Sequence, residues 1–92
     1  MNTILVSYDL MAPGKDYARL WSHLESYPNY IKPLESVWLI KTTLSAEEIR
    51  NKIKLYIDSN DRLLVINVTG DGAAWQNLIG GKTHTEWIKE NL

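Results

Sequence analysis

Residues 4–9 are Ile4-Leu5-Val6-Ser7-Tyr8-Asp9, an apolar run that ends on a carboxylate. The run is short and aliphatic, and a breaker-rich Met-Ala-Pro-Gly stretch follows it at 11–14, which predicts a buried strand rather than a helix. Side chains alternate across a strand, so the even-numbered residues share one face and the odd-numbered residues, ending at Asp9, share the other. Because both faces are mostly apolar, we expect this strand in the middle of a sheet that is covered on both sides.

The rest of the chain alternates between helical and strand patterns. Apolar residues recur at helical spacing in two stretches, and short apolar runs near turn residues mark three further strands. The predicted strands are at 3–8, 27–33, 35–42 and 63–68, and the predicted helices are at 16–27 and 46–57. This order predicts an α+β fold of the ferredoxin-like βαββαβ type, with an antiparallel sheet and both helices on one face.

Two local signals refine this order. Pro28 and Pro33 interrupt the strand at 27–33, so we expect it near an edge of the sheet, where a missing backbone donor costs least. Ser45 and Glu48 form a capping box, in which each side chain bonds a free backbone N–H at the start of the second helix.

The C-terminal residues form a tail to this core. A chain of 92 residues fits a single domain, with a core at about 3–68 and a tail at about 69–92. Within the tail we expect a short helical turn at 73–78 and a C-terminal helix that begins at a weaker capping box, at 83–86. Trp87 of that helix is expected to dock on an apolar surface.

One face of the predicted sheet carries no helix. Leu5 and its neighbours on that face would otherwise meet water, so a second copy of the chain stacked there is the simplest cover. Small domains also have few interior positions, and deep clefts in them usually form between two copies. We therefore expect a homodimer.

The composition excludes several function classes. The chain has no cysteine, so it has no disulfide, no thiolate zinc site and no cysteine nucleophile. The formal net charge is −1, so any contact with nucleic acid has to be local. The N-terminus has no positive leader and its apolar run ends at Asp9, too early for a signal peptide or a membrane span. This favours a cytoplasmic protein without a membrane partner.

Most other polar residues have structural explanations. Gly81-Lys82-Thr83 is not a phosphate loop, because Gln76 stands where that motif needs a glycine. The two histidines have no partner at ligand spacing, and for His23 a solvated position on its helix is favoured over a metal site. Nothing in the sequence places a base beside Ser7 or Ser36, so neither is assigned as a nucleophile.

Asp9 has two interpretations. In the first, its carboxylate accepts hydrogen bonds from the amides of the loop at 10–14, which is a common turn arrangement. In the second, it lies at the rim of the face that pairs with a second chain, and a twofold axis near the strand ends brings two copies of Asp9 together. Two carboxylates with waters can bind one Mg²⁺ or Mn²⁺, which can polarise a phosphodiester and activate water.

Four segments of the sequence resemble a known family. They are Tyr8-Asp9 at the end of the first strand, the helix with Tyr17, Leu20 and Leu24, Leu34-Glu35-Ser36-Val37-Trp38, and Asp61-Arg62-Leu63-Leu64-Val65. The pattern resembles the small CRISPR-associated endonuclease family, the lesser subunit of the spacer-acquisition complex. It also resembles the related VapD-type interferase toxins and the short bacterial proteins labelled SinR-like. The resemblance covers about residues 3–68, and the tail is most similar to the SinR-like group.

The resemblance implies a ferredoxin-like homodimer with a nuclease site that depends on Mg²⁺ or Mn²⁺. It gives Asp9 of each chain the catalytic and metal-binding role, and it suggests nucleic-acid contacts at Tyr8, Lys15, Arg19 and Ser36. Ser36 matches the serine of the family's Ser-Val-Phe segment. The chain departs from the family after the aspartate, because a basic stretch often follows there, whereas only Lys15 and Arg19 stand near Asp9 here.

Two functions follow from these expectations. The first is a cytoplasmic, homodimeric, CRISPR-associated or toxin-like endonuclease that hydrolyses RNA or DNA phosphodiesters with a divalent metal at paired Asp9 residues. The alternative is a non-catalytic dimer that binds nucleic acid or scaffolds a larger protein complex and uses Asp9 structurally. In spacer acquisition the family's subunit is mainly a structural bridge. The sequence leaves open whether the chain is an enzyme, and whether it acts on RNA or DNA.

Overall fold

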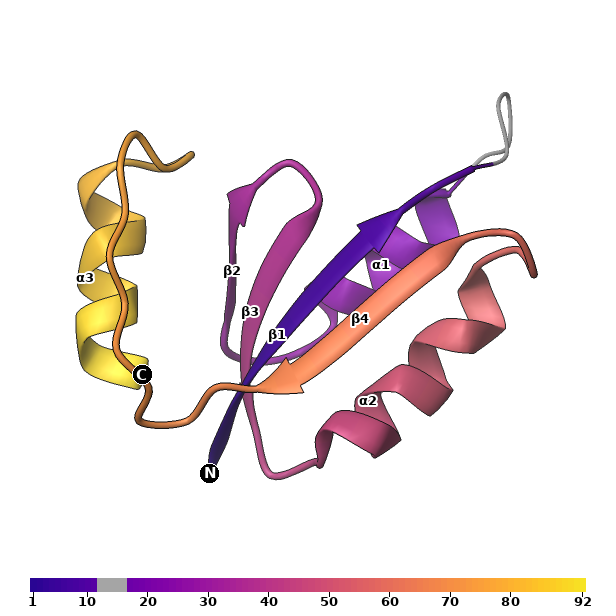
Figure 1. Cartoon of the computed structure of the whole chain (residues 1–92), viewed down its shortest axis with the longest axis horizontal. Helices are drawn as coiled ribbons and strands as arrows, with labels where there is room; N and C mark the ends of the chain where they lie inside the picture. Colours follow the sequence, from indigo (N-terminus) through magenta and orange to yellow (C-terminus); the bar gives the residue numbers. More distant parts are fainter. Residues whose placement is uncertain (12–16) are drawn as a thin grey trace.

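The computed structural model describes residues 1–11 and 17–92 of the chain. Within them, four strands form one sheet, accompanied by three α-helices and a 3-10 turn, η1 (Figure 1). The strands are β1 (Asn2–Asp9), β2 (Tyr30–Leu34), β3 (Val37–Thr42) and β4 (Arg62–Asn67), and the helices are α1 (Ala18–Glu25), α2 (Ala46–Ile53), η1 (Lys54–Tyr56) and α3 (Lys82–Asn91). The predicted α+β class is confirmed. No helix among these residues is long and apolar enough to cross a membrane.

β1 lies inside the sheet, between β3 and β4. The strand order is β2-β3-β1-β4, and every neighbouring pair is antiparallel. Ile4 and Val6 are fully buried on one face of β1 and Tyr8 is nearly so, whereas Asp9 is exposed at its end. The predicted interior strand and its alternation are confirmed, and β2, which contains Pro33, is an edge strand as expected.

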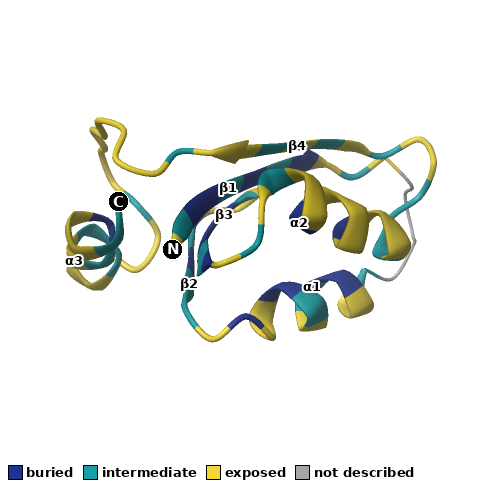
Figure 2. Cartoon of the chain, turned by 90° about the horizontal axis from the view of Figure 1, so that it is seen from below, coloured by how far each residue is buried: buried dark blue, intermediate teal, exposed yellow. Residues whose placement is uncertain are grey.

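Helices α1 and α2 cover the same face of the sheet (Figure 2). Leu20 and Leu24 of α1, together with Ile49 and Ile53 of α2, are fully buried in one cluster with the even-numbered residues of β1. Full burial of one such aliphatic side chain contributes about 1.5–3 kcal/mol. The cluster between these helices and the sheet is therefore the main apolar core. The odd-numbered face of β1 is the face that α1 and α2 do not cover.

Helix α2 begins at the capping box that the sequence predicts. The Ser45 hydroxyl accepts a hydrogen bond from the Glu48 amide, and the Glu48 carboxylate accepts one from the Ser45 amide, each at 3.1 Å. The helix is shorter than the predicted 46–57, because its final turn tightens into η1, as helix ends commonly do.

The tail differs from the prediction at two points. Residues 73–78 form no helical turn and follow an exposed, irregular path, since so short a segment gains too few hydrogen bonds to offset helix nucleation. The segment is instead tied to the edge strand, where the Ile79 amide donates to the Pro33 carbonyl at 2.9 Å. The capping box at 83–86 is also wrong, because α3 begins earlier, with Gly81 at its N-cap and no side-chain cap bond.

Helix α3 packs beside β2 and β3 on the side that α1 and α2 leave uncovered. Ile88 is buried there in a second apolar cluster with Ile31 and Leu39. Trp87 docks at its margin, as expected, and its indole Nε1 donates to Asn29 Oδ1 at 2.6 Å. The tail of the same chain therefore covers part of the face that the sequence assigned to a second copy.

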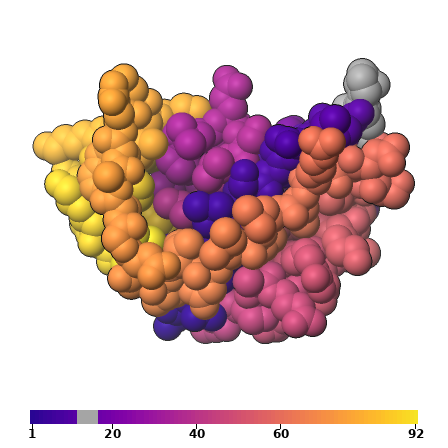
Figure 3. Space-filling model, in the orientation of Figure 1, coloured from indigo at the N-terminus to yellow at the C-terminus, as the bar shows by residue number. Residues whose placement is uncertain are grey.

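We call the face of the sheet opposite α1 and α2 the helix-free face, although α3 covers its β2 and β3 side. Its β1 and β4 side stays open. Leu64 and Ile66 of β4 are 56% and 42% exposed. A mainly apolar groove of about 340 Å³ lies between the sheet and the segment that follows β4, and its lining includes Leu5, Val37 and Trp75. Figure 3 views this face and shows the hollow beside that orange segment, over the purple strands β2 and β3.

Candidate functional site

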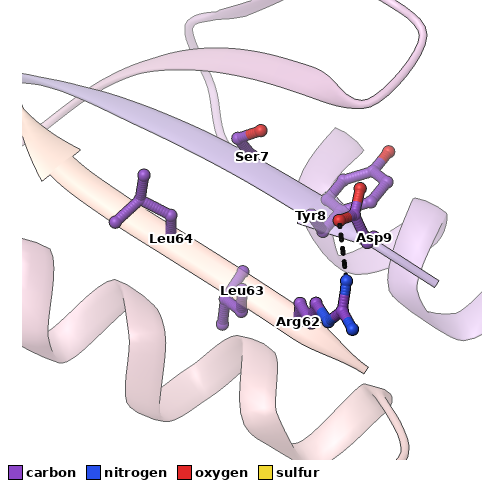
Figure 4. Close-up of a pocket in the computed structure, with 6 residues that line it drawn as sticks. All are labelled: Ser7, Tyr8, Asp9, Arg62, Leu63 and Leu64. Carbon is purple, nitrogen blue, oxygen red and sulfur yellow. Dashed lines mark ion pairs between the residues drawn. The ribbon is translucent and has the colours of Figure 1, made fainter. Parts of the chain in front are cut away.

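Asp9 and Arg62 lie at opposed positions of β1 and β4. Asp9 is the last residue of β1 and Arg62 is the first of β4, and the antiparallel register pairs them directly. Arg62 Nη1 is 3.9 Å from Asp9 Oδ2 (Figure 4). The side chain of Asp9 is 67% exposed and that of Arg62 is 73% exposed, so solvent screens the pair and both groups can reach a ligand.

A shallow hollow of about 250 Å³ surrounds this ion pair. Ser7 and Leu64, the register pair two residues along the strands, form part of its lining. Because side chains alternate along a strand, they share the helix-free face with Asp9 and Arg62. The hollow therefore brings together a carboxylate, a guanidinium and a hydroxyl beside an exposed leucine.

Asp61 ties together the chain segments around this hollow. Its Oδ1 accepts a hydrogen bond from the Met11 amide at 2.6 Å, and the Tyr17 hydroxyl donates a forked bond to both carboxylate oxygens, at 2.9 and 3.0 Å. Met11 lies two residues after Asp9, and Asp61 immediately precedes Arg62. One carboxylate thus anchors the backbone at both members of the ion pair.

Sequence reasoning missed the roles of Asp61 and Arg62. The one available signal was that both residues begin the last segment of the family resemblance. The loop interpretation of Asp9 concerns the amides of residues 10–14, and residues 12–14 fall outside the described part of the chain. Of the described loop amides, that of Met11 bonds to Asp61 and not to Asp9.

Tyr8 neighbours Asp9 in sequence but presents its ring to the other face of the sheet. The ring packs against Trp21 of α1, with centroids 5.6 Å apart, and the Trp38 indole Nε1 donates to the Tyr8 hydroxyl at 3.0 Å. Burial raises the pKa of this hydroxyl, and the bond from Trp38 offsets part of the rise. Tyr8 supports the site from the core, and its ring is not available on the face where Asp9 lies.

The other predicted contacts are spread around the fold. Ser36 is exposed in the turn between β2 and β3, and its carbonyl accepts a hydrogen bond from the Tyr8 amide at 3.2 Å, so it borders the end of β1. Arg19 is exposed on α1, on the helix side of the sheet. Lys15 falls outside the described residues. The structure thus brings Ser36 near the strand end and places Arg19 elsewhere.

The number of side chains that could bind a metal ion limits how an ion could be held at this hollow. Within residues 1–11 and 17–92, no three His, Cys, Asp or Glu side chains gather into a metal site. Among the described residues that line the hollow around the ion pair, Asp9 is the one carboxylate. Mg²⁺ usually binds proteins through one or two carboxylates, with waters and substrate phosphates as the other ligands. The residues fit such an ion if a second copy supplies a second Asp9.

A comparison with protein-family models found no model that matches the chain.

Proposed function

We propose that the chain is a homodimeric, divalent-metal-dependent endonuclease of ferredoxin-like fold that hydrolyses phosphodiester bonds of RNA or DNA in the cytoplasm. In this proposal the chain is similar in kind to the small CRISPR-associated endonucleases and their VapD-type and SinR-like relatives. One observation carries the proposal: the carboxylate of Asp9 ends an interior strand, is 67% exposed, and has a cation as its neighbour. A carboxylate and a guanidinium are suited to binding a metal and a phosphate, respectively.

The second copy would stack on the helix-free face beside β1 and β4. Leu64 and Ile66 are exposed there, next to the Asp9–Arg62 pair, and exposed apolar side chains that adjoin one another favour a protein partner. The tail already covers the β2 and β3 side of this face. A twofold axis on the open side passes near the strand ends and can bring two Asp9 carboxylates to one ion.

A different dimer, formed edge to edge by two β4 strands, would not build this site. If two copies of β4 paired antiparallel about their midpoint, Arg62 would lie opposite Asn67 of the partner. The two Arg62 residues would then be separated by five residues along the strand, or roughly 17 Å. The two Asp9 carboxylates, which lie beside Arg62, would be too far apart to share an ion. The proposal therefore requires face-to-face stacking.

Each side chain then has a defined role. Asp9 of each copy would hold Mg²⁺ or Mn²⁺, which when bound supplies charge neutralisation at the phosphate and lowers the pKa of a bound water. Arg62 stands beside the carboxylate and can bind a phosphate oxygen through its guanidinium. Asp61 holds the backbone on both sides of the pair, so the two groups keep their spacing.

The alternative is a non-catalytic dimer that scaffolds a larger complex. It is favoured by the local charge balance, because Arg62 already neutralises Asp9 within one chain. In that case the exposed groups around Leu64 would serve contact with another macromolecule, and Asp9 would orient Arg62.

A cleavage assay tests the proposal. Wild-type protein, Asp9→Asn and Glu90→Gln are incubated with labelled single-stranded RNA and duplex DNA, with Mg²⁺ or with chelator. Glu90 is an exposed acid on α3, so Glu90→Gln is a matched control for the loss of one negative charge. We expect Asp9→Asn to lose about a hundredfold or more in rate, as removal of a metal ligand should cost several kcal/mol of transition-state stabilisation. Equal cleavage by wild type and Asp9→Asn, or none by either, contradicts the nuclease.

A further inference from the structure

A second hollow lies on the helix side of the molecule, across the sheet from Asp9. It has a volume of about 470 Å³ and lies where α1 meets η1. The described residues that line it are mostly polar or aromatic, and none of them is a carboxylate: Ala18, Arg19, Ser22, His23, Ser26 and Tyr56. We call this the helix-side hollow.

The Arg19 guanidinium lies over an aromatic ring in this hollow. Its guanidinium carbon lies 5.5 Å from the centroid of the Tyr56 ring, within the range of a cation–π contact. The His23 ring stacks on the same tyrosine, with centroids 4.9 Å apart and planes 25° apart, and its Nε2 lies 3.0 Å from the Tyr27 hydroxyl. Arg19 forms no ion pair with any described residue. The guanidinium therefore lies over the Tyr56 ring, and no described residue accepts a hydrogen bond from its N–H donors.

Two elements each place a cation at or near the hollow, Arg19 from α1 and Lys52 from α2. Arg19 lies in the first turn of α1, which has no acidic residue, although a cation at that end of a helix is disfavoured by about 0.3–1 kcal/mol. The pKa of His23 is lowered mainly by burial and also by the positive charge of Lys52 on α2, so Lys52 lies close to the hollow. The acids of α2, Glu47 and Glu48, lie in its first turn, at the opposite end of that helix. A cation that has no ion pair among the described residues, at a disfavoured end of a helix, suggests a role beyond folding.

We infer that the helix-side hollow binds a phosphate group of the nucleic-acid strand, through Arg19 and the Ser22 hydroxyl. Ser22 lies three residues after Arg19, so the two side chains are neighbours on one side of α1. A guanidinium binds phosphate oxygens through two parallel N–H donors, and a nearby hydroxyl can donate a third bond. The Tyr56 ring already packs against His23 and Arg19, so it is not free to stack on a base. The hollow therefore binds the phosphate backbone of a strand and makes no base-specific contact.

The position of the hollow connects it to the proposed active site. The end of β1, the start of α1, η1 and the start of β4 all lie at one end of the fold (Figure 1). A strand held at Arg19 can therefore pass around this end of the sheet toward Asp9 and Arg62. The claim that the bound strand is also the strand that is cleaved rests on the proposed function. The claim that a phosphate binds at Arg19 does not.

Binding is measured in the presence of chelator, so that cleavage plays no part. Fluorescence anisotropy of labelled single-stranded RNA and DNA is recorded for wild type, Arg19→Glu, Lys52→Glu and Lys89→Glu. Lys89 is exposed on α3, away from α1, so Lys89→Glu makes the same change of net charge elsewhere. We expect Arg19→Glu to weaken binding about tenfold or more and to lower the salt slope by about one phosphate contact. Lys52→Glu should weaken it less, and Lys89→Glu within about twofold.

Each outcome decides the inference. Equal losses in Arg19→Glu and Lys89→Glu would show a general charge effect, and unchanged or absent binding would show no phosphate site; both overturn it. If Arg19→Glu does not fold by circular dichroism, Ser22→Asp places a carboxylate in the same hollow and is expected to give the same loss. Strong, Arg19-dependent binding without any cleavage in Mg²⁺ would overturn the nuclease and leave the hollow's assignment standing.

Discussion

Asp9 and Arg62 occupy directly paired positions of β1 and β4, and their charged groups are 3.9 Å apart at a place where both side chains are mostly exposed. An exposed ion pair of this length contributes at most about 1 kcal/mol to folding. The pair is thus not needed to hold the strands together, since the sheet register and the buried faces of β1 do that. Its chemistry can therefore be altered without unfolding the protein.

The first prediction concerns this independence from stability. Asp9→Asn and Arg62→Gln should each change the free energy of unfolding by no more than about 0.5–1 kcal/mol, because both side chains are screened by water. Urea denaturation followed by tryptophan fluorescence measures this. A loss of several kcal/mol in either variant would instead show that the pair is structural.

Asp61 is predicted to behave in the opposite way. Asp61→Ala removes the acceptor for the Met11 amide, the Asp58 amide and the Tyr17 hydroxyl. Bonds to a charged acceptor are worth about 1.5–3 kcal/mol each in favourable cases and are not additive, so we expect a loss of about 2–4 kcal/mol. The same urea experiment checks it, with Asp9→Asn as the aspartate control. A change below about 0.5 kcal/mol would mean that Asp61 does not hold the loop ends together.

The dimer face is tested by one charged substitution with a matched control. Leu64→Glu places a carboxylate on the open side of the helix-free face, whereas Leu55→Glu makes the same change on η1, where the leucine is 75% exposed. Both should fold, since both leucines are exposed. Light scattering should show a monomer for Leu64→Glu and a dimer for Leu55→Glu and wild type. A wild-type monomer, or a dimer in all three, would contradict stacking on this face.

The stability of the fold should fall in mild acid because of His23. Burial, followed by the charge of Lys52, lowers the pKa of this imidazole below its ordinary value of 6.5. The unfolded chain then binds a proton that the folded chain does not, so the folded state loses stability as the pH falls through 6.5.

His23→Gln isolates this contribution, because glutamine does not titrate and can still bond the Tyr27 hydroxyl. Midpoints of urea denaturation are compared at about pH 7.5 and 5.5 for both proteins. The wild type should lose more stability between these values than His23→Gln. An equal loss in the two proteins would show that His23 does not titrate across the transition.

The parts of the fold set by local pattern could be predicted from the sequence. Alternation in β1, helical spacing in α1 and α2, and the Ser45–Glu48 box were each sufficient to place an element. The tail could not be predicted in this way: the path of residues 73–78 depends on a bond between Ile79 and Pro33, far apart in the sequence. Likewise, helix α3 covers part of the sheet through a contact of Ile88 that no local pattern reveals.

The site shows the same division. Asp9 was identifiable because it ends a buried strand. Arg62 and Asp61 were not, because their proximity to Asp9 follows from the register of β1 with β4, which joins residues more than half the chain apart. The sequence puts Arg19 close to Asp9, yet the fold places it on the helix side of the sheet, with its guanidinium over the Tyr56 ring.

The number of Mn²⁺ ions bound per chain tests the central claim, a site shared by two Asp9 residues. Electron paramagnetic resonance can count bound ions in wild type, in Asp9→Asn and in the Glu90→Gln control. We predict about one ion for every two chains in wild type and in Glu90→Gln, and loss of that ion in Asp9→Asn. One ion per chain, no bound ion, or binding that survives in Asp9→Asn would contradict the shared site.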